Sequence, residues 1–183
     1  MKTVQPIRDP KLISFMKDKL KTKHEKYYIM FICGINIGLR VSDVLNLKVS
    51  DIMGRSHILI TEQKTGKHKR FLINDKLLCE LERYIRDNEL GIDDYLVQSR
   101  KGENKPLTRI QAYRVLNDVA KELGLQEIGT HTMRKTFGFW HYKQYKDIAI
   151  LQDIFNHSAP SITLRYIGIN DDMKDDTIRN FYI

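Results

Sequence analysis

The chain has 183 residues, of which 42% are hydrophobic and 30% are charged. With 10 glycines and 4 prolines, this composition is that of a folded globular domain and excludes a disordered or fibrous chain. Lysine and arginine number 31 against 23 aspartates and glutamates, a formal net charge of +8. This excess favours a polyanionic partner such as nucleic acid; the alternative is that it only keeps the protein soluble.

Neither a disulfide framework nor a secretion signal is indicated. Cys33 and Cys79 lie in apolar helical patterns, without the spacing of paired metal ligands. The N-terminus lacks a signal-peptide pattern, and no apolar run is long enough to cross a bilayer. We therefore expect a cytoplasmic protein without a membrane partner.

The first 47 residues predict three helices. Asp9 and Pro10 have the form of an N-cap followed by a proline at the first helical position. Residues 25–37 are apolar nearly all round, which is typical of a central buried helix. Gly38 then loosens the chain, and Ser42 or Asp43 is expected to cap a short third helix.

Arg40 is predicted at a turn between apolar helices, where the loss of hydration of its charge would need a partner. Asp43 is the nearest candidate. Two interpretations stay open: a buried structural ion pair between Arg40 and Asp43, or an aspartate that orients Arg40 towards a ligand.

The pattern changes to period two at 57–73, where two short apolar segments flank a polar loop with a glycine. This predicts an antiparallel β-hairpin. Its tip is basic and holds Lys64, Lys67, His68, Lys69 and Arg70. These charges either protect exposed sheet edges or form a finger that contacts DNA, in which Lys64 has a role beyond phosphate contact.

The middle of the chain predicts two more helices, joined by a brief extended segment at 93–98 and a basic loop at 99–106. Asn74 caps the first helix, which we interpret as scaffold. Thr108 caps the second, which runs to Leu123 and is expected to bury Ile110, Tyr113, Leu116, Val119 and Ala120. Gln111, Arg114 and Asn117 project from it. Such side chains contact base edges and phosphates, or simply face solvent.

His131 and Arg134 lie three positions apart at the start of a predicted helix that runs to Tyr145, so both can reach one bound anion. The free N–H groups and the dipole of this first turn also favour an anion. The sequence therefore predicts an anion site at this helix terminus.

Two more candidates follow. Asp147 caps a helix over 148–155, Asn156 is expected to end it in the left-handed conformation, and His157 comes next. A short helix from Ser161 ends at Tyr166, whose phenol adds a nucleophile to the anion site. We interpret the anion as a DNA phosphodiester.

In chain order the candidates are Gly38-Leu39-Arg40 with Asp43, Lys64 on the hairpin, His131-Thr132-Met133-Arg134, His157, and Thr163-Leu164-Arg165-Tyr166. This series resembles the catalytic domain of the tyrosine recombinases, the phage integrase family, from about Lys11 onward. The resemblance implies a mainly α fold with a small antiparallel β-hairpin, that is, an α+β catalytic domain.

The resemblance also implies a role for each candidate. Arg40 and Arg134 grip the scissile phosphate, Lys64 protonates the departing 5′-oxygen, His131 assists proton transfer, His157 donates a hydrogen bond to the phosphate, and Tyr166 attacks phosphorus. Lys67, Lys69, Arg70, Gln111 and Arg114 are the expected DNA-binding residues. A phenol with a pKa of about 10 needs a base or a strongly positive field to react at neutral pH. Two arginines supply that field, so no metal and no nucleotide cofactor are expected.

The sequence departs from the usual family pattern at three places. Asp43 stands where glutamate is commoner, Lys135 where histidine is frequent, and Phe155-Asn156 where Leu-Gly usually precedes the histidine. None of these departures removes a reacting group.

We expect residues 1–183 to form a single catalytic domain without the N-terminal core-binding domain of most members, as either an excised domain or a short recombinase. Residues 167–183 are expected to be the family's C-terminal tail. Its apolar residues Ile178, Phe181 and Tyr182 either dock in trans on a neighbouring protomer or fold back on their own core.

The predicted function is a site-specific recombinase or integrase that cuts and rejoins double-stranded DNA through a 3′-phosphotyrosyl intermediate, as a homotetramer on DNA and a monomer in free solution. Two alternatives stay open: a relaxing enzyme like the type IB topoisomerases, and a DNA-binding regulator of the same fold without catalytic activity.

Overall fold

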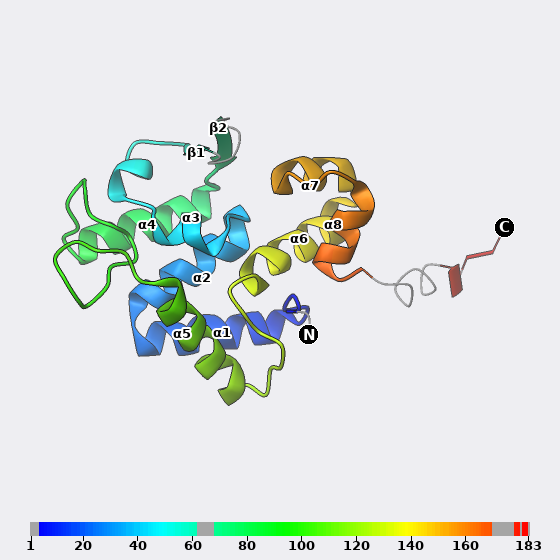
Figure 1. Ribbon diagram of the computed structural model, residues 1–183, viewed down its shortest axis with the longest axis horizontal. Coiled ribbons are helices and arrows are strands. Elements are labelled where there is room, and N and C mark those ends of the chain that lie inside the picture. Colours follow the sequence, from blue (N-terminus) through cyan, green and yellow to red (C-terminus); the bar gives the residue numbers. More distant parts are fainter. Residues whose placement is uncertain (1–3, 62–67, 170–177, 180, 183) are drawn as a thin grey trace.

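Helices dominate the structure, a computed structural model that describes residues 4–61, 68–169, 178–179 and 181–182 (Figure 1). The elements in this part of the chain are α1 (Pro10–Lys23), α2 (Glu25–Ile37), α3 (Val41–Leu45), the 3-10 helix η1 (Val49–Asp51), β1 (His57–Thr61), β2 (His68–Leu72), α4 (Asp75–Asp87), α5 (Arg109–Glu122), α6 (Thr132–Tyr145), α7 (Ile148–Phe155) and α8 (Pro160–Ile167). The two strands pair antiparallel. The predicted mainly α fold with a small hairpin is therefore confirmed.

Local capping explains where four of these helices begin. The Asp9 carboxylate accepts from the backbone N–H of Lys11, and the Asn74 and Asp147 side chains each accept from the third helical N–H, of Leu77 and Ile150. Thr108 and Gln111 form a reciprocal capping box at the start of α5. These four predicted caps are confirmed.

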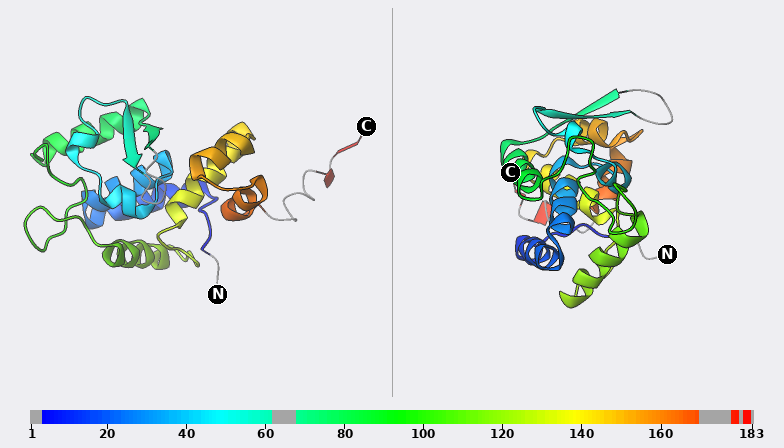
Figure 2. Two further views of the ribbon diagram at one scale, coloured as in Figure 1. Left: turned by 45° about the horizontal axis from the view of Figure 1, so that its top comes forward. Right: turned by 90° about the vertical axis from the view of Figure 1, so that its left-hand side faces the viewer.

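Helix α2 is the centre of the main core, as its apolar sequence predicts. It contacts α1, α3, α4 and α6, and Figure 2 shows it surrounded by these elements. Gly34 brings α2 close to α6, because a Cβ there would lie 2.7 Å from the Cβ of Met133. This packing fixes the start of α6 relative to the end of α2, the two places that carry the predicted arginines.

A smaller apolar cluster joins α6, α7 and α8 around the buried side chains of Leu151, Phe155 and Ile167. The ring of Tyr166 packs against this cluster. The predicted nucleophile is thus held by a small core of its own, beside the main one (Figure 1).

Two predicted boundaries differ from the structure. Helix α3 begins at Val41, so Arg40 itself occupies the N-cap position and the predicted cap at Ser42 or Asp43 is wrong. Helix α8 begins at Pro160 rather than Ser161, because proline is tolerated in the first helical turn. Segment 93–98, predicted to be extended, contributes to two isolated bridges, Lys48 with Tyr95 and Gln98 with Pro106.

The predicted inner face of α5 is partly wrong. Ile110 and Tyr113 are 64% and 49% exposed, whereas Ala112, Leu116 and Val119 are buried. The stripe that packs on the core therefore runs through the smaller Ala112, which leaves the two larger side chains outside the core.

Alternation along β2 separates its basic residues into two groups. Lys69 and Phe71 are half-buried, whereas His68, Arg70 and Leu72 are exposed. The predicted tip residues Lys64 and Lys67 lie outside the described residues. Lys69 was predicted at the basic tip of the hairpin, but its side chain is half-buried.

The segment before α1 forms hydrogen bonds with α6 and with the C-terminal end of α8, and so connects the main core to the smaller apolar cluster. The Ile7 N–H donates to the Thr136 hydroxyl at 2.9 Å, and the Trp140 indole N–H donates to the Ile7 carbonyl at 3.0 Å. Arg8 donates to the carbonyl of Gly168, the C-cap of α8, at 2.7 Å. This segment thus fixes the end of the helix that carries Tyr166.

The described end of the chain lies apart from this body (Figure 1). Ile178, Phe181 and Tyr182 are 66%, 68% and 97% exposed, so they do not fold back on the core.

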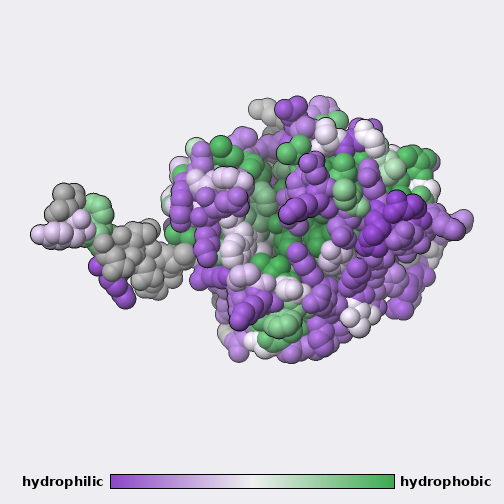
Figure 3. All heavy atoms as spheres, turned by 180° about the vertical axis from the view of Figure 1, so that it is seen from behind, coloured by the Kyte–Doolittle hydropathy of each residue, from purple (hydrophilic) through white to green (hydrophobic). Residues whose placement is uncertain are grey.

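Figure 3 shows the face of the molecule opposite to the one seen in Figure 1. This face is mostly hydrophilic, with small hydrophobic areas between the polar side chains. Among the described residues, we find no helix that meets the length and hydropathy needed to traverse a lipid bilayer.

Candidate active site

Arg134 is the most buried charged residue of the predicted site, with 5% of its surface exposed. Its two terminal nitrogens donate to backbone carbonyls, one to Gly38 at 2.6 Å and one to Phe155 at 3.0 Å. The guanidinium also lies over the ring of Phe155, at 4.5 Å from the ring centroid. Burial lowers the pKa of Arg134, but a guanidinium keeps its charge in proteins.

The partners of Arg134 come from two separate elements. Gly38 ends α2 with φ +76°, a conformation that favours glycine. Phe155 ends α7, just before Asn156 with φ +55°. The end of α2 and the end of α7 therefore both orient one arginine of α6.

Arg40 lies at the N-cap of α3 and lines the same cavity as Arg134, together with Asp43 and Lys69. The predicted desolvation of Arg40 is wrong, because its side chain is exposed once the chain leaves α2 at Gly38. Among the described residues, no ion pair joins Arg40 to Asp43. Two guanidiniums from distant parts of the sequence therefore share one small cavity.

Lys69 adds a third cation to this cavity. Its ammonium donates to the Asp153 carbonyl at 2.6 Å, which links the hairpin to α7. A carbonyl partner fixes the ammonium without neutralising its charge. Lys69 therefore contributes to the positive potential of the cavity.

Tyr166 projects from α8 into a group of aromatic rings. Its ring centroid lies 5.1 Å from that of His157 and 5.3 Å from that of Phe155. Burial raises the pKa of the Tyr166 phenol, whereas the charges of Arg134 and Arg40 pull this pKa down. Both arginines thus act on the protonation of the candidate nucleophile.

His131 precedes α6 as its N-cap, and its Nδ1 lies 3.4 Å from the Tyr166 hydroxyl oxygen. Burial lowers the pKa of His131, and the neighbouring positive charges of Arg109, Lys135, Arg134 and Arg40 lower it further. His131 is therefore a neutral imidazole near pH 7 that can exchange a proton with the phenol.

His157 follows Asn156 directly, and its Nδ1 lies 3.0 Å from the hydroxyl oxygen of Thr163 on α8. Burial lowers the pKa of His157, followed by the charges of Arg134 and Arg40. Thr163, which is fully buried, thus fixes the orientation of this imidazole.

The structure brings together five of the six predicted catalytic residues: Arg40, His131, Arg134, His157 and Tyr166. The sixth, Lys64, lies outside the described residues. Of the predicted DNA-binding residues, Arg70 and Arg114 are exposed, Lys69 lines the cavity, Gln111 is half-buried and part of the capping box, and Lys67 lies outside the described residues.

Sequence reasoning named two further residues, Lys135 and Thr163, without giving either a role at the candidate site. Lys135 is buried, and its Nζ lies 5.0 Å from the Tyr166 ring centroid. Thr163 holds His157. The spacing of Thr163 and Tyr166, three positions apart on one helix, could have indicated that they share a face, whereas the fold alone turns Lys135 towards Tyr166.

Comparison with known proteins agrees with this geometry. Residues 7–173 match the profile of the phage integrase family. The chain is 48% identical over 172 residues to the probable integrase/recombinase YoeC of Bacillus subtilis, a match that covers 94% of this chain and 93% of YoeC.

Two solved structures have the same fold. The XerA recombinase superposes with a TM-score of 0.76 at 22% identity, over 98% of this chain and 68% of that one. The XerH recombinase, bound to a palindromic difH substrate after cleavage, superposes with a TM-score of 0.74 at 17% identity, over 98% and 54%.

This chain spans 39%, 64% and 52% of three further curated tyrosine recombinases, so it corresponds to part of those proteins and to nearly all of YoeC. The profile match and the identity to YoeC indicate the same family as the order of the site residues in the sequence. The chain therefore belongs to the phage integrase family, the tyrosine recombinases.

Proposed function

We propose that this protein is a site-specific DNA recombinase that cleaves and rejoins DNA strands through Tyr166. The observation that carries the proposal is that Arg40 and Arg134 share one cavity and that the charges of both lower the pKa of this phenol. The relatives are named as recombinases or integrases, and neither a relaxing enzyme nor an inactive regulator has a counterpart among those reported above.

In the proposed reaction, the Tyr166 oxygen attacks the scissile phosphorus while Arg40 and Arg134 donate hydrogen bonds to the non-bridging oxygens. A planar guanidinium suits this task because it can donate two parallel hydrogen bonds to a phosphate. The bond from phosphorus to the 5′-oxygen breaks, which leaves a 3′-phosphotyrosyl ester and a 5′-hydroxyl. Attack by the 5′-hydroxyl of another strand reverses the step and releases Tyr166.

Each proton has a proposed route. Neutral His131 accepts the proton of the phenol at their 3.4 Å contact, and the departing 5′-oxygen takes a proton from Lys64 on the hairpin. His157, held by Thr163, donates from its other ring nitrogen to the phosphate. The positive charges of Arg40 and Arg134 stabilise the additional negative charge of the transition state.

We propose that the reaction needs neither a metal ion nor ATP. The phosphotyrosyl ester retains the energy of the broken phosphodiester, and side-chain cations provide the stabilisation that Mg²⁺ gives in other phosphoryl transfers. Cleavage is therefore expected to be unchanged in EDTA and without nucleotide. We propose that the protein acts on DNA in the cytoplasm, associated with the nucleoid of a bacterium or phage-infected cell.

The test is a suicide substrate, a DNA duplex with a nick next to the cleavage position, so that the released fragment diffuses away and the covalent complex accumulates. Wild-type protein should form a species of higher mass that survives denaturation, and Tyr166→Phe should not. Tyr145→Phe is a matched control, because Tyr145 is exposed on α6. A covalent complex that persists in Tyr166→Phe would contradict the proposal.

A further inference from the structure

Lys26, in the first turn of α2, is a buried charge without an acidic partner. Only 5% of its surface is exposed, and no ion pair or side-chain hydrogen bond to its ammonium is found among the described residues. Its Nζ lies 5.5 Å from the centroid of the Tyr27 ring. Burial lowers the pKa of Lys26, and the charge of Arg100 lowers it further. A buried cation without an acidic partner costs free energy, and an anion bound beside it would offset that cost.

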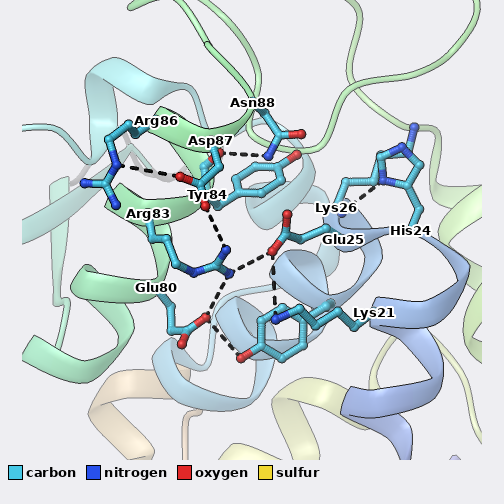
Figure 4. A network of polar contacts seen from close by, with 11 residues as sticks. Lys21, His24, Glu25, Lys26, Glu80, Arg83, Tyr84, Arg86, Asp87 and Asn88 are labelled. Atoms are coloured by element: carbon cyan, nitrogen blue, oxygen red, sulfur yellow. Dashed lines mark hydrogen bonds and ion pairs between the residues drawn. The ribbon is translucent and has the colours of Figure 1, made fainter.

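The nearest acid is occupied elsewhere. Glu25 accepts from Arg83 at 2.7 Å and lies 4.0 Å from Lys21. Figure 4 shows the Glu25 carboxylate directed towards these two residues. The acid adjacent in sequence therefore cannot neutralise Lys26.

Lys26 lines a cavity of about 160 Å³ that has the composition of an anion site. Arg100 and Arg114 line it from the basic loop and from α5, and Gln111 adds an amide. No acidic residue lines this cavity, and neither arginine has an ion pair among the described residues. Three cations and one amide thus converge from three segments of the chain.

We propose that this cavity binds a second phosphate of the DNA backbone, away from the phosphate at which the strand is cut. Lys26 would be the buried anchor of this site, and Arg100, Arg114 and Gln111 its walls. The proposal rests on the proposed function for the identity of the ligand, because inorganic phosphate has the same chemistry.

Two observations favour DNA over a free ion. Helix α2 separates the two sites: Lys26 lies in its first turn and Arg40 follows its end, and the rise of 1.5 Å per residue from Lys26 to Ile37 is about 17 Å along the helix axis. Helix α5 connects the two sites. The charge of Arg109, at the start of this helix, lowers the pKa of His131, and Arg114 lines the second cavity. A duplex held at the active site and lying along α5 would therefore reach the second cavity with its backbone.

The first measurement is the melting temperature of the free protein in a buffer without phosphate. Lys26→Met removes the uncompensated charge and keeps the length of the side chain, so its melting temperature should equal or exceed that of the wild type. Lys76→Met, at an exposed position on α4, is the control for the loss of one positive charge. A lower melting temperature in Lys26→Met alone would show that the charge stabilises the fold and would contradict the proposal.

The second measurement is affinity for a duplex of arbitrary sequence as a function of salt, in the Tyr166→Phe background so that no covalent complex forms. Each phosphate contact contributes about −0.9 to the slope of log K against log salt. Lys26→Met should bind several-fold more weakly, with a slope less negative by about one, whereas Lys76→Met should match its parent. Unchanged affinity and slope in Lys26→Met would contradict the proposal.

Arg114→Gln gives the same test at an exposed position if Lys26→Met does not fold, with the same predicted change of slope. Inorganic phosphate provides the other comparison: if it stabilises the wild type through Lys26 while DNA affinity is independent of Lys26, the site binds a small ion and the DNA proposal is wrong. Because none of these measurements uses strand cleavage, their outcome is separate from that of the suicide substrate.

Discussion

Arg134 shows how a single residue can be buried and still keep its charge free of an acidic partner among the described residues. Its partners are the carbonyls of Gly38 and Phe155, which orient the guanidinium without cancelling its charge. A carboxylate in their place would have formed an ion pair and weakened the field at Tyr166. This choice of partner leaves the positive charge of Arg134 for a phosphate.

We predict that Arg134→Lys folds but cleaves DNA poorly. An ammonium keeps the charge, but it lacks the planar fork that contacts two carbonyls and a phosphate together. The loss should be about 100-fold or more in the rate of covalent complex formation, by analogy with removing a donor to a transition-state oxyanion. Single-turnover cleavage measures it, with Arg86→Lys on the exposed face of α4 as control. A rate near that of the wild type would show that charge alone is sufficient.

Histidine protonation predicts how the stability of the free protein depends on pH. The pKa values of His24, His131, His141 and His157 are all lowered, with burial as the largest cause. The unfolded chain therefore binds more protons below about pH 6.5, so the free energy of unfolding falls as pH decreases through this range.

The melting temperature should therefore decrease between about pH 7 and pH 5.5, above the range in which carboxylates titrate. His141 is the position to replace, because its buried Nδ1 has no hydrogen-bond partner among the residues that the structure describes and it lies outside the site. His141→Gln should flatten part of this decrease. A melting temperature that stays level or rises towards pH 5.5 would contradict the burial of these rings.

At the scale of elements, local signals predicted helix boundaries well because capping is a short-range interaction. Asp9, Asn74, Thr108 and Asp147 each start a helix as expected. The face of α5 that packs on the core depends instead on the neighbouring elements. The prediction that Ile110 and Tyr113 are buried failed for that reason.

Gly38 is the element boundary with the largest expected effect on the site. We predict that Gly38→Ala lowers both stability and cleavage, because the new Cβ would lie 2.5 Å from the Phe137 ring and the carbonyl that holds Arg134 would move. Gly124→Ala is the matched control: its φ is +68°, but no atom lies within 4 Å of the added Cβ. Thermal melting and cleavage of both variants measure the difference. Equal losses would mean that backbone strain alone matters.

At the scale of the whole molecule, the candidate site lies where the main core meets the α6–α8 cluster. The order of Arg40, Arg134, His157 and Tyr166 could be recognised in the sequence, but their convergence depends on the packing of α2 against α6 and of α7 against α8. The burial of Lys26 could not be predicted, because a lysine in the first turn of a helix gives the same sequence pattern whether that turn is exposed or buried.

The end of the chain suggests how protomers associate. Phe181 and Tyr182 are exposed although apolar, and we predict that they dock on a neighbouring protomer once DNA is bound. Phe181→Ser should then reduce the tetramer on DNA, measured by sedimentation velocity, without changing the melting temperature of the free monomer. Ile92→Ser, another exposed apolar position, is the control. An unaltered assembly would show that the tail does not join protomers.

The central claim is that two arginines prepare the Tyr166 oxygen to take up a DNA phosphate. The most direct measurement is mass spectrometry of the peptide that carries the nucleotide after trapping on nicked DNA. We predict that the added mass lies on Tyr166 through the 3′-phosphate and disappears when either Arg40 or Arg134 is replaced by alanine. Modification of another residue, or undiminished modification without both arginines, would contradict the account.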